Sequence, residues 1–357
     1  MEEQNISFAS FGLVVLDEIR FPNQPPMKNI LGGSGAYATL GARLFLPPPM
    51  SQTLVWPLHI GNDFPDSIKE LLQSWNTTLL MKKTPGELST RGLLEYKDTT
   101  FGPKDFKYTT PILNIDENSI AESHILAAKA FHYLATPQDI QTRVSRLLTL
   151  RQKAGISSRP LIIWEPAPLS CNPENLQAFL EAARHVDILS PNHLELGRFF
   201  SRTGKDTPAK TGIEELASII LDRGVGPDKK GIILIRAGEQ GCLIQSWDLP
   251  PTWLPPFYDS ESSSGQQAVG VVDPTGAGNA FLGGFGVGYI QTKDAVTAAC
   301  FGTVSASIAL EQIGMPTKTR SGDMELWNGT SVEERLQEYM SRDEVELSLR
   351  RDEVPQR

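Results

Sequence analysis

The chain has 357 residues, of which 40% are hydrophobic and 21% are charged. These values are typical of a globular protein with a sizeable core, and the length fits one large domain or one domain with an appendage. The 33 basic residues face 42 acidic ones, which gives a formal net charge of −9. A nucleic-acid binder normally shows a basic excess, so we expect no nucleic-acid partner.

The cysteines and the N-terminal segment favour the interior of a cell. Cys171, Cys242 and Cys300 lie far apart and show no paired metal-ligand spacing, so the sequence supports neither a disulfide framework nor a zinc site. The first ten residues are acidic and lack the apolar run of a secretory signal. The uncharged stretch 274–292 is rich in glycine, and we interpret it as a buried helix with its entry loop. We expect a cytoplasmic protein with no membrane partner.

Short apolar runs alternate with longer helical patterns along the chain. The predicted strands are 6–16, 54–60, 130–135, 161–165, 186–190 and 231–238, and the predicted helices are 35–45, 66–75, 139–153, 173–184, 194–201 and 213–223. Several strands are apolar nearly throughout, as is typical of parallel strands covered on both faces. The alternation predicts an α/β sandwich with a mostly parallel sheet.

Two segments depart from this alternation. Residues 88–113 contain strand-like runs without a helix between them, which predicts a small β excursion: either a lid or a surface hairpin without a role. Arg91, within it, could clamp an anion or be a solvated lid residue. After Gly314 the composition becomes polar. We therefore divide the chain into a domain over 1–320 and a C-terminal part over 321–357, with a helix at 331–342 and a charged, poorly ordered tail over the last dozen residues.

The segment 271–290 carries the strongest local signal. A strand is predicted to end at Asp273, and a turn with Gly276, Ala277 and Gly278 then opens a helix rich in small residues. The unpaired N–H groups at a helix start attract anions, and glycine lets the backbone approach a phosphate closely. The alternative is a tight strand-to-helix turn whose glycines serve only its backbone conformation.

Other phosphate motifs fit less well. The sequence contains no P-loop pattern. Gly33, Gly35 and Ala38 match the dinucleotide fingerprint loosely, but they follow no predicted strand directly and lack an acidic residue near the required position. A nicotinamide-dependent oxidoreductase is therefore the weakest of the alternatives.

Five features occur together in a fixed order. Asp17 lies at the end of the first predicted strand, and Gly32–Gly33 precede the first helix. Asn192 and Glu195 form an Asn-x-x-Glu pattern after a strand, and Arg236, Gly238 and Gly241 follow another. The DPTGAGN turn comes last. This set resembles the PfkB or ribokinase family of carbohydrate kinases over roughly residues 6–316, and it is similar to the fungal maintenance-of-killer-like subgroup.

The resemblance implies a ribokinase-like three-layer α/β/α sandwich and transfer of the γ-phosphoryl group of ATP, with Mg²⁺, to an alcohol group of a sugar-like acceptor. Asp17, Gly32, Gly33 and Tyr37 would then face the acceptor. Asn192, Arg236, Gly238 and Gly241 would line the nucleotide site, and Glu195 would organise Mg²⁺ indirectly. Gly276, Ala277 and Gly278 would form the anion hole, Asp273 would help hold a monovalent cation as in some relatives, and the lid could pair two chains in a homodimer.

Three positions depart from the family pattern. The catalytic base Asp of the family is Asn279 here, and a carboxamide cannot accept a proton at neutral pH. Tyr37 replaces a sugar-contacting Asn, and 165–167 replaces the more common Asp-x-Asn. Because phosphoryl transfer depends mainly on positioning and charge stabilisation, three alternatives remain: a slow kinase, a kinase with a substitute base, and a nucleotide-binding pseudokinase that acts by binding a partner.

Overall fold

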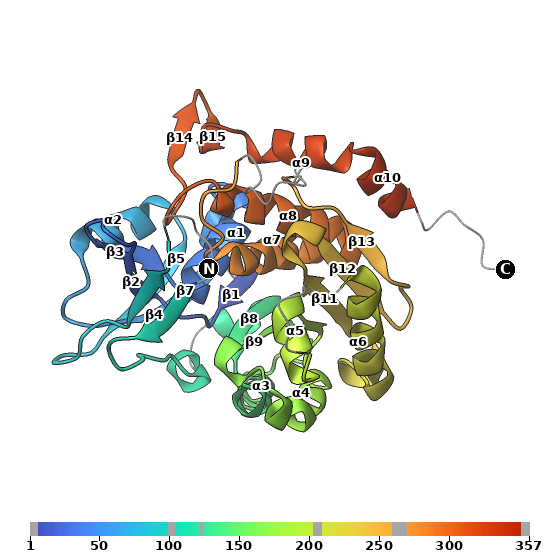
Figure 1. Cartoon of the computed structure of the whole chain (residues 1–357). Helices are drawn as coiled ribbons and strands as arrows, with labels where there is room; N and C mark the ends of the chain where they lie inside the picture. Colours follow the sequence, from blue (N-terminus) through green and yellow to red (C-terminus); the bar gives the residue numbers. More distant parts are fainter. Residues whose placement is uncertain (1–5, 99–103, 122–123, 203–208, 259–269, 351–357) are drawn as a thin grey trace.

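The computed structural model describes residues 6–98, 104–121, 124–202, 209–258 and 270–350 (Figure 1). Its centre is a nine-stranded sheet with the order β13-β12-β11-β10-β9-β8-β1-β4-β5. The sheet strands are β1 (Phe8–Ser10), β4 (Leu54–Ile60), β5 (Thr78–Lys83), β8 (Ala130–Ala135), β9 (Leu161–Pro166), β10 (Ile188–Leu189), β11 (Ile232–Arg236), β12 (Cys242–Ser246) and β13 (Thr252–Leu254). From β11 to β5 all neighbours are parallel, whereas β12 and β13 pair antiparallel at one edge.

The order in which the chain adds strands defines where a ligand can bind. The chain forms β1 first, adds β4 and β5 on one side of it, and then adds β8 to β11 on the other side. The strand order therefore reverses beside β1. In open α/β sheets ligands bind outside the carboxyl ends of the strands at such a reversal.

Helices cover both faces of the sheet, and each face has its own core. The helices are α1 (Ser34–Leu44), α2 (Asp66–Ser74), α3 (Pro137–Lys153), α4 (Leu176–Ala183), α5 (His193–Phe199), α6 (Lys210–Arg223), α7 (Ala277–Thr292), α8 (Ala295–Leu310), α9 (Val332–Met340) and α10 (Asp343–Leu349). Helices α3 to α6 lie on one side of the sheet and α1, α7 and α8 on the other (Figure 1). Alternate residues of β9 point to opposite faces: Ile163 belongs to the core with α1, α7 and α8, whereas Ile162 and Trp164 belong to the core with α3 to α6. The predicted three-layer sandwich is confirmed.

A second, four-stranded sheet forms the lid. Its order is β3-β2-β6-β7, with β2 (Val15–Arg20), β3 (Met27–Gly32), β6 (Arg91–Tyr96) and β7 (Lys104–Tyr108). The predicted β excursion at 88–113 supplies two of these strands, and residues 99–103 lie outside the described part of the chain. The other two strands come from the N-terminal segment, whose first part sequence analysis assigned to the main sheet.

The predicted single strand over 6–16 is therefore wrong. The main-sheet strand ends at Ser10, and the chain enters the lid sheet at Val15. Between them it passes so close to α1 that a Cβ on Gly12 would lie 2.3 Å from the backbone nitrogen of Gly35. Residues 6–16 are nearly all buried and mostly apolar, so the hydrophobic pattern shows no break between the two strands. Asp17 consequently lies inside β2, not at the end of the first strand.

Two expectations for the later part of the chain also need correction. No strand ends at Asp273: residues 270–276 are irregular, and the amides of Val272 and Asp273 both donate to the carbonyl of Leu310 at 2.7 and 3.1 Å. The C-terminal tail begins later than expected, because α10 continues to Leu349 and the hydroxyl of its buried Ser348 donates to the carbonyl of Trp253. Residues 351–357 lie outside the described part.

The C-terminal elements pack on the helical layer of α8. A hairpin of β14 (Lys318–Ser321) and β15 (Met324–Trp327) leads into α9 and α10, which lie along α8 (Figure 1). Trp327, Leu336 and Tyr339 belong to the same core as α7 and α8. The predicted boundary at residue 320 falls inside this hairpin. Among the described residues no helix is long and apolar enough to cross a bilayer.

Candidate active site

The predicted site residues come from four places that the fold brings to one end of the sheet. Glu165 lies in the last part of β9, and Arg236 ends β11. Asn192 follows β10 and forms an isolated parallel bridge with Arg236. Asn279 lies in the first turn of α7. The carboxyl ends of three neighbouring strands, on the β8 side of the reversal in strand order, therefore meet the start of α7.

Arg236 links these elements through its guanidinium group. Its Nη1 lies 2.8 Å from Glu165 Oε1 and its Nη2 lies 3.8 Å from Glu195 Oε2, while Nη2 also donates to the carbonyl of Ser190 at 2.8 Å. A Cβ on Gly278 would lie 2.0 Å from Nη1. Glycine at this position thus lets a cation, which balances two buried carboxylates, lie against the first turn of α7.

Asn192 and Glu195 form a reciprocal cap at the start of α5. The side chain of Asn192 accepts from the amide of Glu195, and the carboxylate of Glu195 accepts from the amide of Asn192, both at 2.8 Å. Burial raises the pKa of Glu195 to about 7, although Arg236 acts in the opposite direction. The sequence pattern therefore has a structural explanation as a cap, and the Mg²⁺ role of Glu195 and the nucleotide role of Asn192 stay predictions.

The turn before α7 has the backbone expected of an anion cradle. Gly276 adopts a left-handed conformation (φ 79°), and the ring of Tyr37 lies where its Cβ would be, 2.1 Å from that position. The amide of Ala280 donates to the carbonyl of Gly276, so the N–H groups before it begin the helix without intrahelical partners. Gly276 to Asn279 are only partly buried, whereas α7 is buried from Ala280 to Gly288. The start of α7 is thus accessible and suited to an anion.

Tyr37, on α1, packs against this turn. Its buried ring packs on Gly276, and its hydroxyl donates to the carbonyl of Gly314 at 3.4 Å. Burial, with the charges of Asp273 and Asp17, raises the pKa of the Tyr37 hydroxyl well above its ordinary value. The predicted contact of Tyr37 with an acceptor stays a prediction.

Asp17 is a buried carboxylate on the lid sheet. Its side chain is held between two glycines, because a Cβ on Gly32 or Gly92 would lie 1.9 or 2.3 Å from its oxygens. Within the described part of the chain its Oδ1 has no hydrogen-bond partner. Burial raises the pKa of Asp17 to about 7; the charge of Asp273 adds to this rise and Lys104 opposes it. An unpaired buried acceptor is costly, and it marks a place where a ligand hydroxyl would be bound favourably.

The glycine pair before α1 has two separate structural roles. Gly32 makes room for Asp17, and Gly33 (φ 95°) is the N-cap of α1. Helix α1 does follow a strand directly, β3, contrary to the sequence-based expectation. However, β3 is an antiparallel lid strand, so the segment is no βαβ unit and the dinucleotide interpretation of Gly33, Gly35 and Ala38 gains nothing.

Lys104 was missed by sequence analysis. It begins β7 and donates its ammonium group to the hydroxyl of Tyr96 at 2.9 Å and to the hydroxyl of Thr275 in the turn before α7. Asp273 accepts from the amide of the same Thr275 at 2.9 Å. Burial lowers the pKa of Lys104, and the carboxylates of Asp273 and Asp17 oppose this shift. In sequence Lys104 is one of several lysines in a polar strand, and nothing marks it.

The backbone conformation of the loop after β11 accounts for its two glycines. Gly238 (φ 59°) and Gly241 (φ 87°) both have positive φ, and a Cβ on Gly241 would lie 1.9 Å from the carbonyl oxygen of Leu254. The ring of His193 lies 3.8 Å from the Cβ position of Gly238. The nucleotide-binding role of both glycines stays a prediction.

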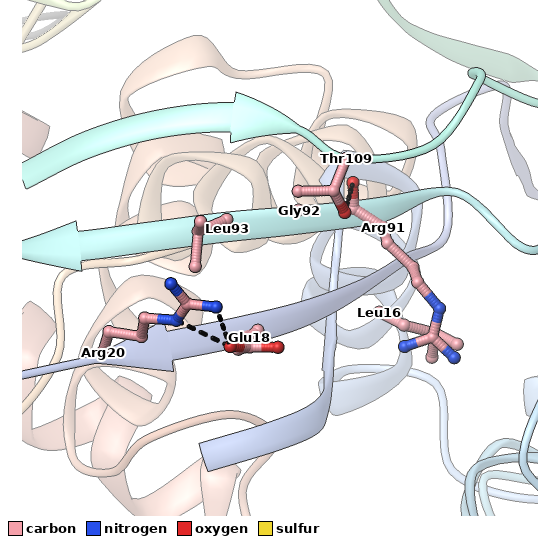
Figure 2. A pocket seen from close by; sticks show the side chains of 7 residues that line it. All are labelled: Leu16, Glu18, Arg20, Arg91, Gly92, Leu93 and Thr109. Carbon is pink, nitrogen blue, oxygen red and sulfur yellow. Dashed lines mark hydrogen bonds and ion pairs between the residues drawn. The ribbon is translucent and has the colours of Figure 1, made fainter. Parts of the chain in front are cut away.

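Arg91 belongs to a different face of the lid. It forms an ion pair with Asp63 at 2.6 Å and donates to the side chain of Asn29, so it ties the lid to the loop after β4. Figure 2 shows a pocket on this sheet, and Leu16, Glu18 and Arg20 line it from alternate positions of β2. Asp17 points to the opposite face. This pocket is therefore separate from the candidate active site.

The next question is whether the described side chains can bind a metal ion. Nowhere among them do three or more His, Cys, Asp or Glu side chains gather in a way that could hold a metal ion. Mg²⁺ does not require such a cage, because it keeps several waters and binds one or two carboxylates together with substrate phosphates. Glu195, which is buried beside Arg236, fits an indirect role of that kind. The monovalent cation at Asp273 stays a prediction.

Comparisons with known proteins show the family of the chain. Residues 23–320 match the pfkB family carbohydrate kinase family. The chain is 33% identical to an uncharacterised protein of Schizosaccharomyces pombe, over 94% of this chain and 93% of that protein. It is 28% identical to the protein MAK32 of Saccharomyces cerevisiae, over 95% and 93%.

Solved structures give the same fold. Ribokinase from Giardia lamblia superposes with a TM-score of 0.66 at 15% identity, covering 94% of this chain and 99% of that chain. A putative ribokinase II of E. coli, solved in complex with ATP and Mg²⁺, superposes with a TM-score of 0.61 at 19% identity, covering 93% and 99%. The chain therefore belongs to the pfkB family of carbohydrate kinases, and its similarity to MAK32 confirms the predicted fungal subgroup.

Proposed function

We propose that the chain is a Mg²⁺-dependent phosphotransferase that moves the γ-phosphoryl group of ATP to a hydroxyl of a sugar-like or nucleoside-like acceptor. One observation carries the proposal: the buried Asp17 has an unpartnered oxygen and is influenced by the charge of Lys104, which donates to Thr275 in the glycine turn that starts α7. Lys104 thus connects a carboxylate that could bind a substrate hydroxyl with a turn that could bind an anion.

On the acceptor side, Asp17 would bind hydroxyl groups through its unpartnered oxygen. At neutral pH its carboxyl group is close to its pKa, so a ligand that donates hydrogen bonds stabilises the ionised form. The neighbouring Gly32 and Gly92 leave no side chains over the carboxylate. This favours a polyhydroxylated ligand that approaches closely.

On the nucleotide side, the amides of Gly276 to Gly278 would hold the phosphoryl group, and Arg236 would add positive charge beside them. When bound, Mg²⁺ would neutralise charge on the phosphates, and Glu195 would hold it through water. Lys104 lies between the two halves of the site and would oppose the charge that develops during transfer. Excluding water beneath the lid would strengthen each of these interactions.

Isothermal titration with Mg²⁺ and a non-hydrolysable ATP analogue tests the nucleotide site. We expect binding at micromolar to millimolar ligand, and no binding to folded protein would overturn the proposal. A panel of sugars, polyols and nucleosides, assayed for ADP release, then tests the transfer. Asp17→Asn should lose acceptor-dependent turnover and keep nucleotide binding.

A second candidate function is a nucleotide-binding protein without transfer activity. The observation that favours it is the side chain of Asn279, whose amide donates to Glu165 and carries no base. Such a protein would bind the ATP analogue but release no ADP with any acceptor. Acceptor-dependent ADP release by the natural chain would exclude this alternative.

The homodimer through the lid also stays a prediction. Strand β7 is an edge strand of the lid sheet, and Phe106 on it is exposed, so it offers unpaired backbone groups to a second chain. Light scattering coupled to gel filtration gives the mass directly. Phe106→Lys should convert a lid-mediated dimer to a monomer, and an unchanged dimer would locate the interface elsewhere.

A further inference from the structure

Glu165 and Asn279 are in direct contact, although 114 positions separate them in sequence. The amide nitrogen of Asn279 donates to Glu165 Oε2, while Arg236 Nη1 lies 2.8 Å from Glu165 Oε1. Glu165 is 5% exposed, so its carboxylate is buried with a cation on one oxygen and an amide on the other. The ring of His132 lies 3.9 Å from Oε2 on a third side.

The contact fixes which way the carboxamide faces. Burial raises the pKa of Glu165, but Arg236 and His132 lower it further, so the carboxyl group is ionised with a pKa below its ordinary value. An ionised carboxylate can only accept hydrogen bonds. The NH₂ group of Asn279 must therefore face Glu165, and its Oδ1 faces away from it.

The contact also restricts what position 279 can carry. An aspartate there would place an oxygen against Glu165 Oε2, and two ionised carboxylates in contact raise one pKa strongly. A neutral, hydrogen-bond-donating side chain suits the place. The pair thus holds a single negative charge, and that charge lies at position 165.

We propose that Glu165 is a positioning residue that orients Asn279, so that Asn279 Oδ1 accepts a hydrogen bond from the acceptor hydroxyl, and that the pair accommodates only one carboxylate. This inference rests on the proposed phosphotransferase function. It gives position 279 an alignment role without a change of protonation. Phosphoryl transfer depends mainly on such alignment.

The proton balance needs no side-chain base. As the acceptor oxygen bonds to the γ-phosphorus, the bond to the β-phosphate oxygen breaks and its electron pair leaves with ADP. The hydroxyl proton passes to an oxygen of the transferred phosphoryl group. Because the second pKa of a phosphate ester is about 6, that proton is released to water at neutral pH.

A four-protein cycle tests the pairing without any activity: the natural chain, E165Q, N279D and E165Q/N279D, each unfolded thermally between pH 5 and 8.5. We expect N279D to lose stability as pH rises, with a melting temperature about 3 °C or more below the natural chain at pH 8. E165Q/N279D, which again holds one carboxylate and one carboxamide, should recover most of this loss. N118D, which adds a carboxylate at an exposed position, is the matched control and should show no such pH-dependent loss. Equal melting curves for N279D and the natural chain would overturn the pairing, and so would a loss in N279D that the double variant does not recover.

Kinetics test the positioning role. With an acceptor from the screen, E165Q should lower kcat about ten-fold or more and change the KM for ATP less. E165Q/N279D should regain activity, with a new rising limb in its pH profile from the carboxyl group that the second substitution introduces. E70Q removes an exposed carboxylate from α2, outside the candidate site, and should match the natural chain. Full kcat in E165Q would overturn the positioning role.

The two experiments separate failure of this inference from failure of the proposed function. If the natural chain binds the ATP analogue and transfers nothing, the phosphotransferase function and the acceptor contact of Asn279 both fail. The melting cycle still decides in that case whether Glu165 pairs with Asn279.

Discussion

Lys104 on the lid strand β7 donates to the hydroxyl of Thr275 in the turn that opens α7. The same turn is held by Asp273, which accepts from the amide of Thr275 at 2.9 Å. Lys104 therefore joins the lid sheet to the glycine turn of the main domain. A charged side chain thus links the two sheets at the start of α7.

Lys104→Ala should weaken phosphoryl transfer. The variant loses a partly buried cation that donates to Tyr96 and Thr275 and is influenced by the charges of Asp273 and Asp17, and a charge-assisted hydrogen bond is worth about 1.5–3 kcal/mol. We expect kcat/KM to fall roughly ten- to hundred-fold. Lys107→Ala is the matched control, because Lys107 lies on the same strand with 65% of its side chain exposed. Equal losses in both variants would show that the strand matters and the ammonium group does not.

Asp17→Asn should stabilise the protein while abolishing transfer. Burial raises the pKa of Asp17 from 3.8 to about 7, so its favourable contribution is complete below pH about 3.8 and is lost as pH rises to about 7. The stabilising effect of the substitution should therefore be greater at pH 8 than at pH 5, by about 2–3 kcal/mol. Urea unfolding at both pH values measures it.

Asp105→Asn provides the comparison for that experiment, because Asp105 lies on the lid strand β7 and is exposed. Its substitution should change stability equally at pH 5 and pH 8. A gain for Asp17→Asn that is independent of pH would mean that the carboxyl group of Asp17 is not protonated more readily in the folded state.

Gly278→Ala should displace Arg236. The added methyl group would lie 2.0 Å from Nη1, so the guanidinium must move away from the first turn of α7 and from Glu165. We expect about 1–3 kcal/mol of destabilisation and weaker binding of the ATP analogue by titration. Gly197→Ala, in the neighbouring helix α5, meets nothing closer than 3.3 Å and should leave nucleotide binding unchanged. Normal binding by Gly278→Ala would remove Arg236 from the nucleotide site.

Glu325→Ala should destabilise the whole domain. Arg43 on α1 has no exposed surface, and its Nη2 donates to both carboxylate oxygens of Glu325 at 2.7 and 2.8 Å. Removing one partner of a buried ion pair typically costs about 3–5 kcal/mol. Glu346→Ala, which breaks the exposed pair with Arg350, should cost less than about 0.5 kcal/mol. Similar unfolding midpoints for the two variants would contradict the structural role of Glu325.

The sequence was sufficient to predict the layers of the fold and most of the parallel strands of the main sheet. Strands β4 and β8 lie where the apolar runs placed them, because each run is uniform and clearly bounded. The division of 6–16 between two sheets was missed, since buried strands of different sheets look alike. The edge strands β5 and β13 and the antiparallel strand β12 beside β13 were not predicted, because their patterns are mixed or short.

The candidate site was likewise predicted only in part. Asp17, the glycine turn and the Asn-x-x-Glu pattern were identified because they are local motifs. Lys104 and the pairing of Glu165 with Asn279 were not, because they depend on contacts between distant segments. Motif spacing reports local backbone conformation, whereas charge pairing across a sheet is visible only when the chain is folded.

The ion pair between Arg43 and Glu325 has a practical consequence for expression. Every residue assigned to the site precedes position 320, and the match to the family ends there, so a shortened gene ending at that point looks sufficient. Such a protein would retain the buried guanidinium group of Arg43 on α1, the helix whose Tyr37 packs on Gly276, and would lack the carboxylate of Glu325 that pairs with it. We expect it to be insoluble or inactive, and an expression plasmid should include the segment through Leu349.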